Sequence, residues 1–313
     1  MLGSVHDADD ALQDALLRAW RRLATFEGRS SFRAWLYRIA TNVCLDLISS
    51  RPKRVLPIDH GPPAAPGDDL ADPLIESVWV EPFADEVSGL EAGYSSPEAR
   101  YERRESVELA FIVAMQHLPP NQRAVLLLRD VLGFSAREAA EALGTTVASA
   151  NGALRRARRA AAERLPGQSQ QVTLRQLGDD RLRKLVQRYI DAWERADVEA
   201  ILAMLTEDAT FTMPPLPTWY RGHDAIGLFL TRYALSDRWR LVATRANGQL
   251  AFGCYAWDAG AGGHTALSLD VLTVDGTRAS EVTSFVTPYT RGPARERFAV
   301  DVLGRFGLPA RVA

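Results

Sequence analysis

The stretch ALGTTVASANGALRRARRAA (residues 142–161) places four arginines within five positions, directly after a run of small uncharged residues. Like charges one helical turn apart repel each other, so a solvated helix usually mixes the two signs. The next acidic residue along the chain is Glu163. The run is therefore either a solvated face or a surface for an anionic partner. The four arginines are Arg155, Arg156, Arg158 and Arg159.

Helical spacing divides this stretch into an apolar stripe and a polar face. The residues predicted to be buried are Val147, Ala150, Leu154, Ala157 and Ala161. Those left outside are Ser149, Asn151, Gly152, Arg155, Arg156 and Arg159. Small residues let a helix approach a groove closely, short polar side chains reach base edges, and arginines meet phosphates or guanine. This combination favours a DNA-reading helix over a solvated face.

The elements before this helix predict a helix-turn-helix unit. Ser135, followed three residues later by Glu138, is the pattern of a capping box at the start of a helix over 136–143. Gly144 suits the end of that helix, and Thr145 or Thr146 opens the next one. Upstream, helices are expected over 98–117 and 121–132, the second with its apolar side turned inward. The inward residues are Val125, Leu126 and Leu128.

The first 54 residues predict two helices. The first helix has two stripes of residues at helical spacing. One is apolar and is expected to be buried, and the other carries acidic groups. The second helix begins after Ser30 or Ser31 and ends at Arg51-Pro52. The apolar stripe is Leu12, Leu16, Ala19 and Leu23, and the second stripe is Asp10, Gln13, Asp14 and Leu17. The second helix is expected to bury Phe32, Trp35, Leu36, Ile39, Val43 and Leu47, and to show Arg38, Asn42 and Asp46 on its other side.

The charge distribution indicates polyanion-facing modules rather than a uniformly charged protein. The formal net charge is -2, yet residues 1–54 carry nine basic and six acidic side chains, and residues 106–166 carry eight and five. Between them, residues 55–105 have three basic against twelve acidic, while residues 167–313 have seventeen against sixteen. Blocks of like charge indicate which kinds of partner a protein binds, but they do not indicate its fold.

Length and composition describe an ordinary globular chain. At 313 residues, with 47% hydrophobic and 24% charged residues, two or three domains are expected. Because there is no run of 18 apolar residues and the N-terminus carries acids, we expect a cytoplasmic protein without a membrane partner. Cys44 and Cys254 are far apart and support neither a disulfide framework nor a metal cluster, so neither a metal nor another cofactor is expected.

Residues 52–97 are rich in Pro, Gly and Asp and show no periodicity, which predicts a linker without a packed core. The piece VWVEPFADE (78–86) holds three large apolar side chains and serves either as a small packing contact or as a docking segment. Beyond residue 181 a helix is expected to 205, followed by strands separated by the turns Asn247-Gly248 and Asp275-Gly276. This order predicts a separate α+β domain.

The passage LPPNQRAVLLLRDVLGFSAREAAEALGTTVASANGALRRAR resembles the promoter −35-recognising region of extracytoplasmic-function sigma factors in the sigma-70 family. ADDALQDALLRAW and FEGRSSFRAWLYRIATNVCLDLI resemble the region of that family that binds core polymerase and reads the −10 element. The two matches occur in the family's order. The resemblance implies core RNA polymerase and promoter DNA as partners.

Residue by residue, the resemblance assigns roles to three surfaces. It places Ser30, Ser31, Phe32 and Trp35 at the strand-opening loop, with Arg38, Asn42 and Asp46 on the face after it, although Trp35 and Phe32 also suit core packing. The residues that match the polymerase-docking helix are Asp10, Gln13, Asp14 and Leu17. Those expected on the −35-reading helix are Ser149, Asn151, Arg155, Arg156 and Arg159.

The tail (181–310) resembles the cone-shaped SnoaL-like fold of nuclear-transport-factor-like and ketosteroid-isomerase-like proteins. The expected fold class is multidomain: two all-α helical modules, the second a helix-turn-helix, then an α+β SnoaL/NTF2-like domain. We expect the first module over 1–54, an acidic linker over 55–104, the second module over 105–166 and the tail domain over 178–310. Eight of its large apolar residues either line a pocket or form the core: Phe211, Met213, Trp219, Phe229, Trp239, Tyr255, Trp257 and Phe285.

The predicted function is that of an alternative sigma factor, with the tail as a regulatory domain that touches the linker or the first module. A small-molecule or intramolecular ligand is expected there, and no catalytic residue. The titratable candidates for chemistry are Asp208, His223, His264 and Asp270. Two alternatives remain: a conventional helix-turn-helix regulator, and a cyclase- or isomerase-type enzyme with a DNA-binding tether. Family members usually carry helical sequence before the equivalent of MLGSVHDADD, so either the true start lies upstream or part of the polymerase-binding bundle is lacking.

Overall fold

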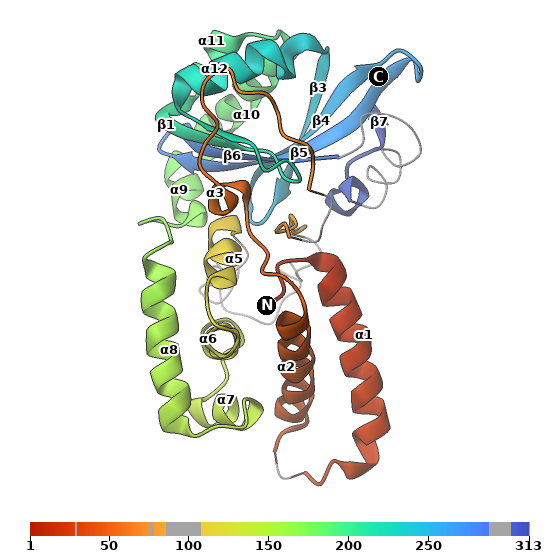
Figure 1. Ribbon diagram of the computed structural model, residues 1–313, viewed down its shortest axis with the longest axis vertical. Coiled ribbons are helices and arrows are strands. Elements are labelled where there is room, and N and C mark those ends of the chain that lie inside the picture. Colours follow the sequence, from red (N-terminus) through yellow and green to blue (C-terminus); the bar gives the residue numbers. More distant parts are fainter. Residues whose placement is uncertain (29, 75–77, 86–107, 288–301, 313) are drawn as a thin grey trace. The chain divides into compact units, whose positions relative to one another are not determined.

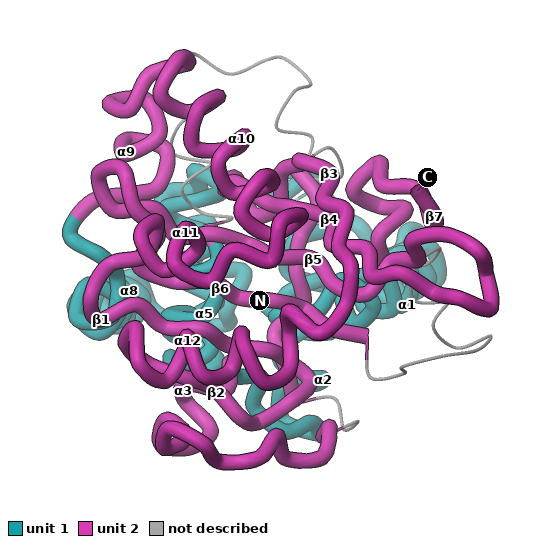
Figure 2. The backbone as a smooth tube through the Cα atoms, turned by 90° about the horizontal axis from the view of Figure 1, so that it is seen from above, with its two compact units in different colours: residues 1–55, 109–167 teal, residues 56–108, 168–313 magenta. Residues whose placement is uncertain are grey.

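The computed structural model describes residues 1–28, 30–74, 78–85, 108–287 and 302–312. They form two compact units that each draw on two stretches of chain (Figure 2). Unit 1 joins Met1–Val55 to Leu109–Gly167, and unit 2 joins Leu56–Glu108 to Gln168–Ala313. The two basic modules of the sequence therefore lie in one unit, and the described part of the acidic connector belongs to the unit of the tail domain.

The first half of unit 1 is a pair of helices, α1 (Val5–Arg22) and α2 (Phe32–Ser50), with the short 3-10 turn η1 (Leu23–Thr25) between them. Each helix starts at a serine whose side chain accepts a hydrogen bond from a backbone N–H three residues on. Ser4 caps α1, and Ser31, rather than Ser30, caps α2, both at 3.1 Å.

The packing face of α1 differs from the expected one. Ala11, Ala15 and Ala19 are buried, whereas the leucines of the predicted apolar stripe are exposed. Alanine side chains allow two helix axes to come close together, so the small residues occupy the contact and the large ones point outward. The exposed apolar residues are Leu12, Leu16, Leu17, Trp20 and Leu23.

The second half of unit 1 contains α5 (Leu109–Gln116), α6 (Pro120–Leu126), the π-helical turn η2 (Leu127–Val131), α7 (Ala136–Ala142) and α8 (Val147–Ala162). The helix expected over 98–117 is described only in its second part, because residues 98–107 lie outside the described residues. The helix expected over 121–132 is a short α-helix continued by a π turn. Its predicted inward residues, Val125, Leu126 and Leu128, are buried.

The helix-turn-helix forms as its sequence predicts. Ser135 and Glu138 make a reciprocal capping box at the start of α7. Gly144 follows the end of α7 with φ +60°, a backbone conformation that favours glycine. The side chain of Thr146 then caps α8 by accepting a hydrogen bond from the Ser149 N–H at 3.1 Å. These caps fix where α8 starts and which residues its first turn exposes.

Unit 2 is built on one mixed sheet in the order β2-β1-β6-β5-β4-β3, with β7 paired to β5. Figure 1 shows α10, α11 and α12 gathered over one face of this sheet. The strands are β1 (Leu205–Thr212), β2 (Trp219–Arg221), β3 (Trp239–Ala246), β4 (Gln249–Asp258), β5 (Gly263–Asp275), β6 (Arg278–Val286) and β7 (Arg311–Val312). The helices are α3 (Pro57–His60), α9 (Gln170–Leu177), α10 (Asp179–Glu194), α11 (Val198–Ala203) and α12 (Gly222–Arg232), with the 3-10 turns η3 (Ala234–Ser236) and η4 (Leu303–Phe306).

The aromatic residues of unit 2 mainly build its core. All eight proposed pocket-lining residues are buried except Trp257, which is 41% exposed. Phe211, Phe229 and Trp239 belong to a cluster formed between the helices and the sheet. The turn at Asn247-Gly248 joins β3 to β4 with both residues at positive φ, as the hairpin signal predicts.

Candidate nucleic-acid and protein interfaces

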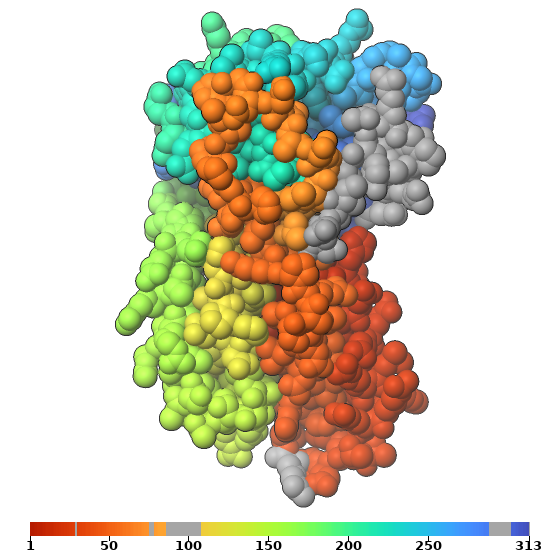
Figure 3. All heavy atoms as spheres, viewed as in Figure 1, coloured from red at the N-terminus to blue at the C-terminus, as the bar shows by residue number. Residues whose placement is uncertain are grey.

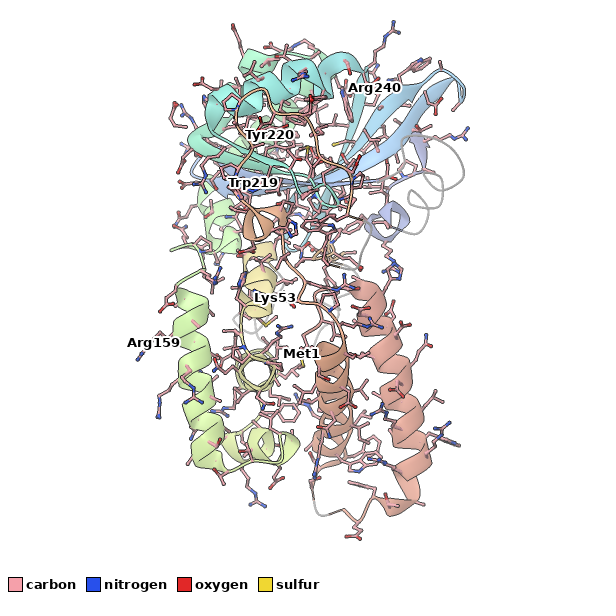
Figure 4. All side chains as sticks on the ribbon, viewed as in Figure 1. Met1, Lys53, Arg159, Trp219, Tyr220 and Arg240 are labelled. Carbon is pink, nitrogen blue, oxygen red and sulfur yellow. The ribbon has the colours of Figure 1, made fainter. Side chains whose placement is uncertain are left out.

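The outer face of α8 carries unburied polar groups. Ser149, Arg155 and Arg156 are exposed, and Asn151 is half-buried. Arg159 is also exposed and projects outward from the helix (Figure 4). Along the opposite side, the alanines and Leu154 of the predicted stripe are buried against α6 and α7. The helix therefore presents three guanidinium groups on a face that begins with a small hydroxyl residue.

The fourth arginine is different. Arg158 donates two hydrogen bonds to the carboxylate of Asp130 on η2, at 2.7 and 2.9 Å. A bidentate pair of this kind satisfies the fork of the guanidinium and ties η2 to α8. The sequence shows no acidic neighbour for the run, yet one of its four charges is neutralised across the fold. Only a contact distant in sequence reveals this.

Val147 is a correction to the predicted buried stripe. It is the first residue of α8 and is 42% exposed. At the first turn of a helix the side chains have fewer neighbours from the preceding turn to cover them. The apolar methyl groups of Val147 thus stand on the exposed N-terminal end of α8, two positions before Ser149.

The start of α2 holds a cluster of three aromatic rings. Phe26, Phe32 and Trp35 have ring centroids 5.3 to 5.7 Å apart. Trp35 is half-buried, but Phe32 is 51% exposed, so the prediction that α2 buries Phe32 is wrong. It lies at the first position of the helix, where the cluster shields only one side of its ring. The arrangement leaves an aromatic surface next to the Ser31 cap.

Further along α2, Arg38 and Asn42 lie one turn apart and both are exposed. Asp46, the third member of this row, accepts a hydrogen bond from Arg18 of α1 at 3.2 Å. The buried side of the helix holds Ile39 and Val43. The row therefore offers one guanidinium and one amide to solvent, while its carboxylate is tied to the neighbouring helix.

Within unit 1, α2 also packs against the helix-turn-helix. Arg33 donates a hydrogen bond to the Leu132 carbonyl at 2.6 Å, and its guanidinium lies 4.6 Å from the ring centroid of Phe134. The rings of Tyr37 and Phe134 meet edge to face, with centroids 5.2 Å apart. Such aromatic pairs contribute about 0.5–1.5 kcal/mol beyond the area they bury. These contacts hold the two basic modules together.

The candidate polymerase-docking residues share an exposed face of α1. Asp10, Gln13 and Leu17 are exposed, and Asp14 is held by Arg18 at 2.8 Å. They lie beside the exposed apolar residues of this helix, among which Trp20 is 78% exposed. A contiguous exposed apolar surface rimmed by polar groups is typical of a protein–protein interface.

The described parts of the connector, residues 57–74 and 78–85, form a strap across unit 2. Figure 3 shows its first part, in orange, lying over atoms of the tail domain. The indole of Trp219 donates to the Gly61 carbonyl at 2.8 Å, and Arg232 donates to Asp69 at 2.7 Å. The Ala71 N–H donates to the hydroxyl of Thr218 at 2.9 Å.

The end of the strap is bound by the β3–β4 turn. Asn247 and Phe83 exchange two hydrogen bonds, at 2.8 and 2.9 Å, and the Gly248 N–H donates to Asp85 at 2.7 Å. Trp79 is 7% exposed, and its ring meets that of His60. Hydrogen bonds of this kind satisfy the backbone N–H and C=O groups of an extended segment. Because they require no apolar periodicity in the sequence, the sequence pattern does not predict where the segment binds.

The four titratable candidates of unit 2 have separate environments. Asp208 is exposed within β1, which begins three residues earlier at Leu205. His223 lies at the start of α12, 3.9 Å from Glu207, and His264 packs against Trp257. Asp270 is 2% exposed and accepts hydrogen bonds from three side-chain hydroxyls, those of Tyr189, Ser268 and Ser284. Burial raises the pKa of the Asp270 carboxyl.

Among the described residues, no helix is both long and apolar enough to cross a membrane. The same residues contain no group of three or more histidine, cysteine or carboxylate side chains that could hold a metal ion.

Three family models match the chain. The model for sigma-70 region 2 matches residues 1–54, that for sigma-70 region 4 matches residues 108–160, and that for a SnoaL-like domain matches residues 186–285. The order of these matches is the order of the modules expected from the sequence.

Relatives extend the similarity over the whole chain. The ECF RNA polymerase sigma factor SigG of Mycobacterium tuberculosis is 39% identical over 99% of this chain and 79% of its own length. The ECF RNA polymerase sigma factor SigJ of the same organism is 27% identical over 96% of this chain and 90% of its own. The crystal structure of Mycobacterium tuberculosis SigJ shares the fold, with a TM-score of 0.52 at 21% identity, covering 94% of this chain and 90% of that one.

Proposed function

The chain belongs to the extracytoplasmic-function sigma factors of the sigma-70 family, and we propose which of its surfaces carry out the steps of promoter-specific transcription initiation. Sigma factors of this family bind core RNA polymerase and promoter DNA. The main support for this proposal is the outer face of α8, on which Ser149, Arg155, Arg156 and Arg159 are all exposed. We assign the −35 element to this face, with Asn151 at its edge.

The −10 element is assigned to the start and outer row of α2. Phe32 and Trp35 offer aromatic surface on which an unpaired base can stack. Arg38 and Asn42, both exposed, supply a phosphate contact and a base-edge contact. The Ser31 hydroxyl already caps α2, so its role is to fix the helix start, whereas Ser30 remains available to the DNA backbone.

Core polymerase is assigned to the exposed face of α1. The acidic and amide groups of Asp10, Gln13 and Asp14 suit a basic partner, and Leu17 supplies apolar contact. The exposed side chains of Leu16 and Trp20 lie beside them and support the assignment. Exposure of apolar surface to water is unfavourable, and a bound partner would remove that surface from water.

Promoter engagement requires unit 1 to open. The −10 and −35 elements lie roughly 25 base pairs apart by their names, or about 85 Å at 3.4 Å per base pair. A compact unit of roughly 100 residues has a radius of gyration of about 13 Å. The packing of Arg33 and Tyr37 on Phe134 is therefore the closed form of the two DNA-reading modules, which separate on the promoter.

The C-terminal unit is assigned a regulatory role exerted through the strap. Its ligand is intramolecular: Thr218, Arg232 and Asn247 bind the connector between the two sigma regions. A non-catalytic role is supported by the separate environments of the four titratable candidates, with Asp270 enclosed by hydroxyl groups.

Gel shifts on promoter DNA, with and without core RNA polymerase, test this proposal against a conventional repressor or activator. We expect a specific complex only with polymerase, and the variant Leu16→Glu should abolish it while leaving thermal unfolding unchanged. A specific complex of the chain alone, unaffected by polymerase, would favour the conventional regulator.

A further inference from the structure

A groove of about 880 Å³ runs along the edge strand β3 of unit 2. It is lined by residues of α9 and α10, of β3 and the start of β4, of η4, and by strap residues 84–85. This volume lies in the range of pockets that hold small organic ligands. Neither the −35 face nor the polymerase-docking face contributes to it.

Three arginines from three elements line the groove: Arg183 of α10, Arg245 of β3 and Arg305 of η4. Arg183 is paired at the surface with Asp180. In the part of the chain that the structure describes, Arg245 and Arg305 form no ion pair. Among the described lining residues the one carboxylate is that of Asp85, which already accepts the hydrogen bond from the Gly248 N–H. The lining thus has an excess of positive charge in a partly enclosed place.

The rest of the lining is largely apolar. Its apolar members include Leu182 and Val186 of α10, Leu250 of β4 and Phe306 of η4. The position of η4 beside β3 is fixed by the Thr244 hydroxyl, which donates to the Phe306 carbonyl at 3.0 Å. Arg245 follows Thr244 and Arg305 precedes Phe306, and both arginines line the groove. Preformed sites of this kind bind with little cost of ordering.

We propose that this groove binds an amphiphilic organic carboxylate, with its apolar body between Val186 and Phe306 and its carboxylate between Arg245 and Arg305. Guanidinium groups bind carboxylates through two parallel hydrogen bonds, and an apolar wall selects for a hydrocarbon body. Because Asp85 and Ala84 of the strap form part of the lining, an occupied groove stabilises the bound strap. The site is independent of the promoter contacts, and binding is measured without DNA or polymerase.

Isothermal titration calorimetry of the full chain tests the proposal. The probe is decanoate below its critical micelle concentration, with decanol as the uncharged control and acetate as the control without a hydrocarbon chain. We expect saturable 1:1 binding of decanoate, and binding at least about tenfold weaker for each control, since charge-assisted hydrogen bonds and apolar burial each contribute more than 1.4 kcal/mol.

Variants separate the two parts of the site. Arg245→Gln combined with Arg305→Gln should weaken decanoate binding by about tenfold or more, and Val186→Gln should weaken it through the apolar wall. Arg188→Gln, an exposed arginine of α10 outside the groove, is the matched control and should bind as the parent does. Circular dichroism verifies that each variant is folded. Three results would each overturn the proposal: no saturable binding of decanoate, equal binding of decanol, or unchanged decanoate binding by the double arginine variant. None of these results bears on sigma-factor activity.

Discussion

Among the single residues of α8, Arg158 differs from the other three arginines of the run because its guanidinium forms an ion pair with a described carboxylate. Arg155, Arg156 and Arg159 are exposed, while Arg158 forms a bidentate pair with Asp130. The sequence alone presents the four as equivalent, because the partner of Arg158 lies 28 residues away in another element. Helical periodicity predicts which face an arginine occupies but does not predict an ion pair across the fold.

This division gives a prediction with an internal control. Arg159→Ala should lower the slope of log affinity against log salt by about one for the promoter complex, because one phosphate contact is lost. Arg158→Ala should leave the salt slope unchanged, because its guanidinium is already paired with Asp130, and loss of a partly exposed ion pair of this kind costs only about 1 kcal/mol or less of stability. Filter binding of the polymerase–sigma complex over a salt series measures both. Equal slopes for the two variants would contradict the assignment.

Asp270 gives a prediction of pH dependence. Burial raises the pKa of its carboxyl in the folded state above the unfolded value of about 3.9. Its contribution to stability is therefore fully present below the unfolded pKa and is lost as the pH rises through the folded pKa. Asp270→Asn cannot titrate, so its free energy of unfolding should fall less between pH 4 and pH 8 than that of the parent chain.

Urea unfolding at a series of pH values measures this difference. The matched control is Asp208→Asn, because Asp208 is exposed on β1 and should give the parental profile. Parallel profiles for Asp270→Asn and the parent would mean that Asp270 remains ionised in the folded chain.

At the scale of elements, the sequence predicts the helix-turn-helix well and the faces of α1 poorly. Ser135, Gly144 and Thr146 are local signals that act within three or four residues, and each has its expected role. In α1, a leucine stripe and an alanine stripe both have helical spacing. Hydrophobicity favours the leucines as the core, but the close approach of α2 selects the alanines, and only the three-dimensional packing decides between them.

The strap shows a second limit of prediction from sequence. VWVEPFADE was open to two interpretations, packing or docking, and the described part is held to the tail domain by hydrogen bonds of its backbone. Extended segments rich in Pro and Gly carry no period that marks their partner. The sequence predicts an acidic connector between two sigma regions, but its binding by Asn247 and Thr218 depends on turn and loop geometry.

The contact between α2 and the helix-turn-helix predicts a measurable opening. Spin labels at Ser49→Cys and Glu163→Cys, both exposed sites in unit 1, report the separation of the two modules once Cys44 and Cys254 are replaced by serine. Double electron–electron resonance should show one compact distance in the free chain and a distance longer by tens of ångströms on the promoter, as a span of about 85 Å requires. An unchanged distance would show that the closed form itself binds the promoter.

At the scale of the whole molecule, one chain combines two sigma regions with a domain that holds the segment between them. The variant Thr218→Val with Asn247→Gly removes two hydrogen-bond acceptors for the strap, and the glycine it introduces at residue 247 tolerates the positive φ of that position. Each lost acceptor leaves a backbone N–H to solvent, at a cost of about 1 kcal/mol in strap binding. Hydrogen exchange of strap amides should accelerate at least about tenfold.

The same variant tests regulation. If the tail domain acts through the strap, transcription with core polymerase should change in the direction produced by deleting residues 175–313. Thr277→Val, an exposed position in the β5–β6 turn, serves as the control and should leave both exchange and transcription unchanged. Accelerated exchange without any change in transcription would separate the strap from regulation.

We propose that two basic helical surfaces on one chain together direct core RNA polymerase to a two-element promoter. Run-off transcription with purified core polymerase and a promoter library measures it most directly. We expect transcripts from promoters sharing a −35 and a −10 element, lost with Arg155→Ala and Arg156→Ala combined and retained with Arg158→Ala. Two results would contradict this proposal. One is that the chain yields no transcript beyond those of core polymerase alone, and the other is that the transcripts do not depend on the −35 sequence.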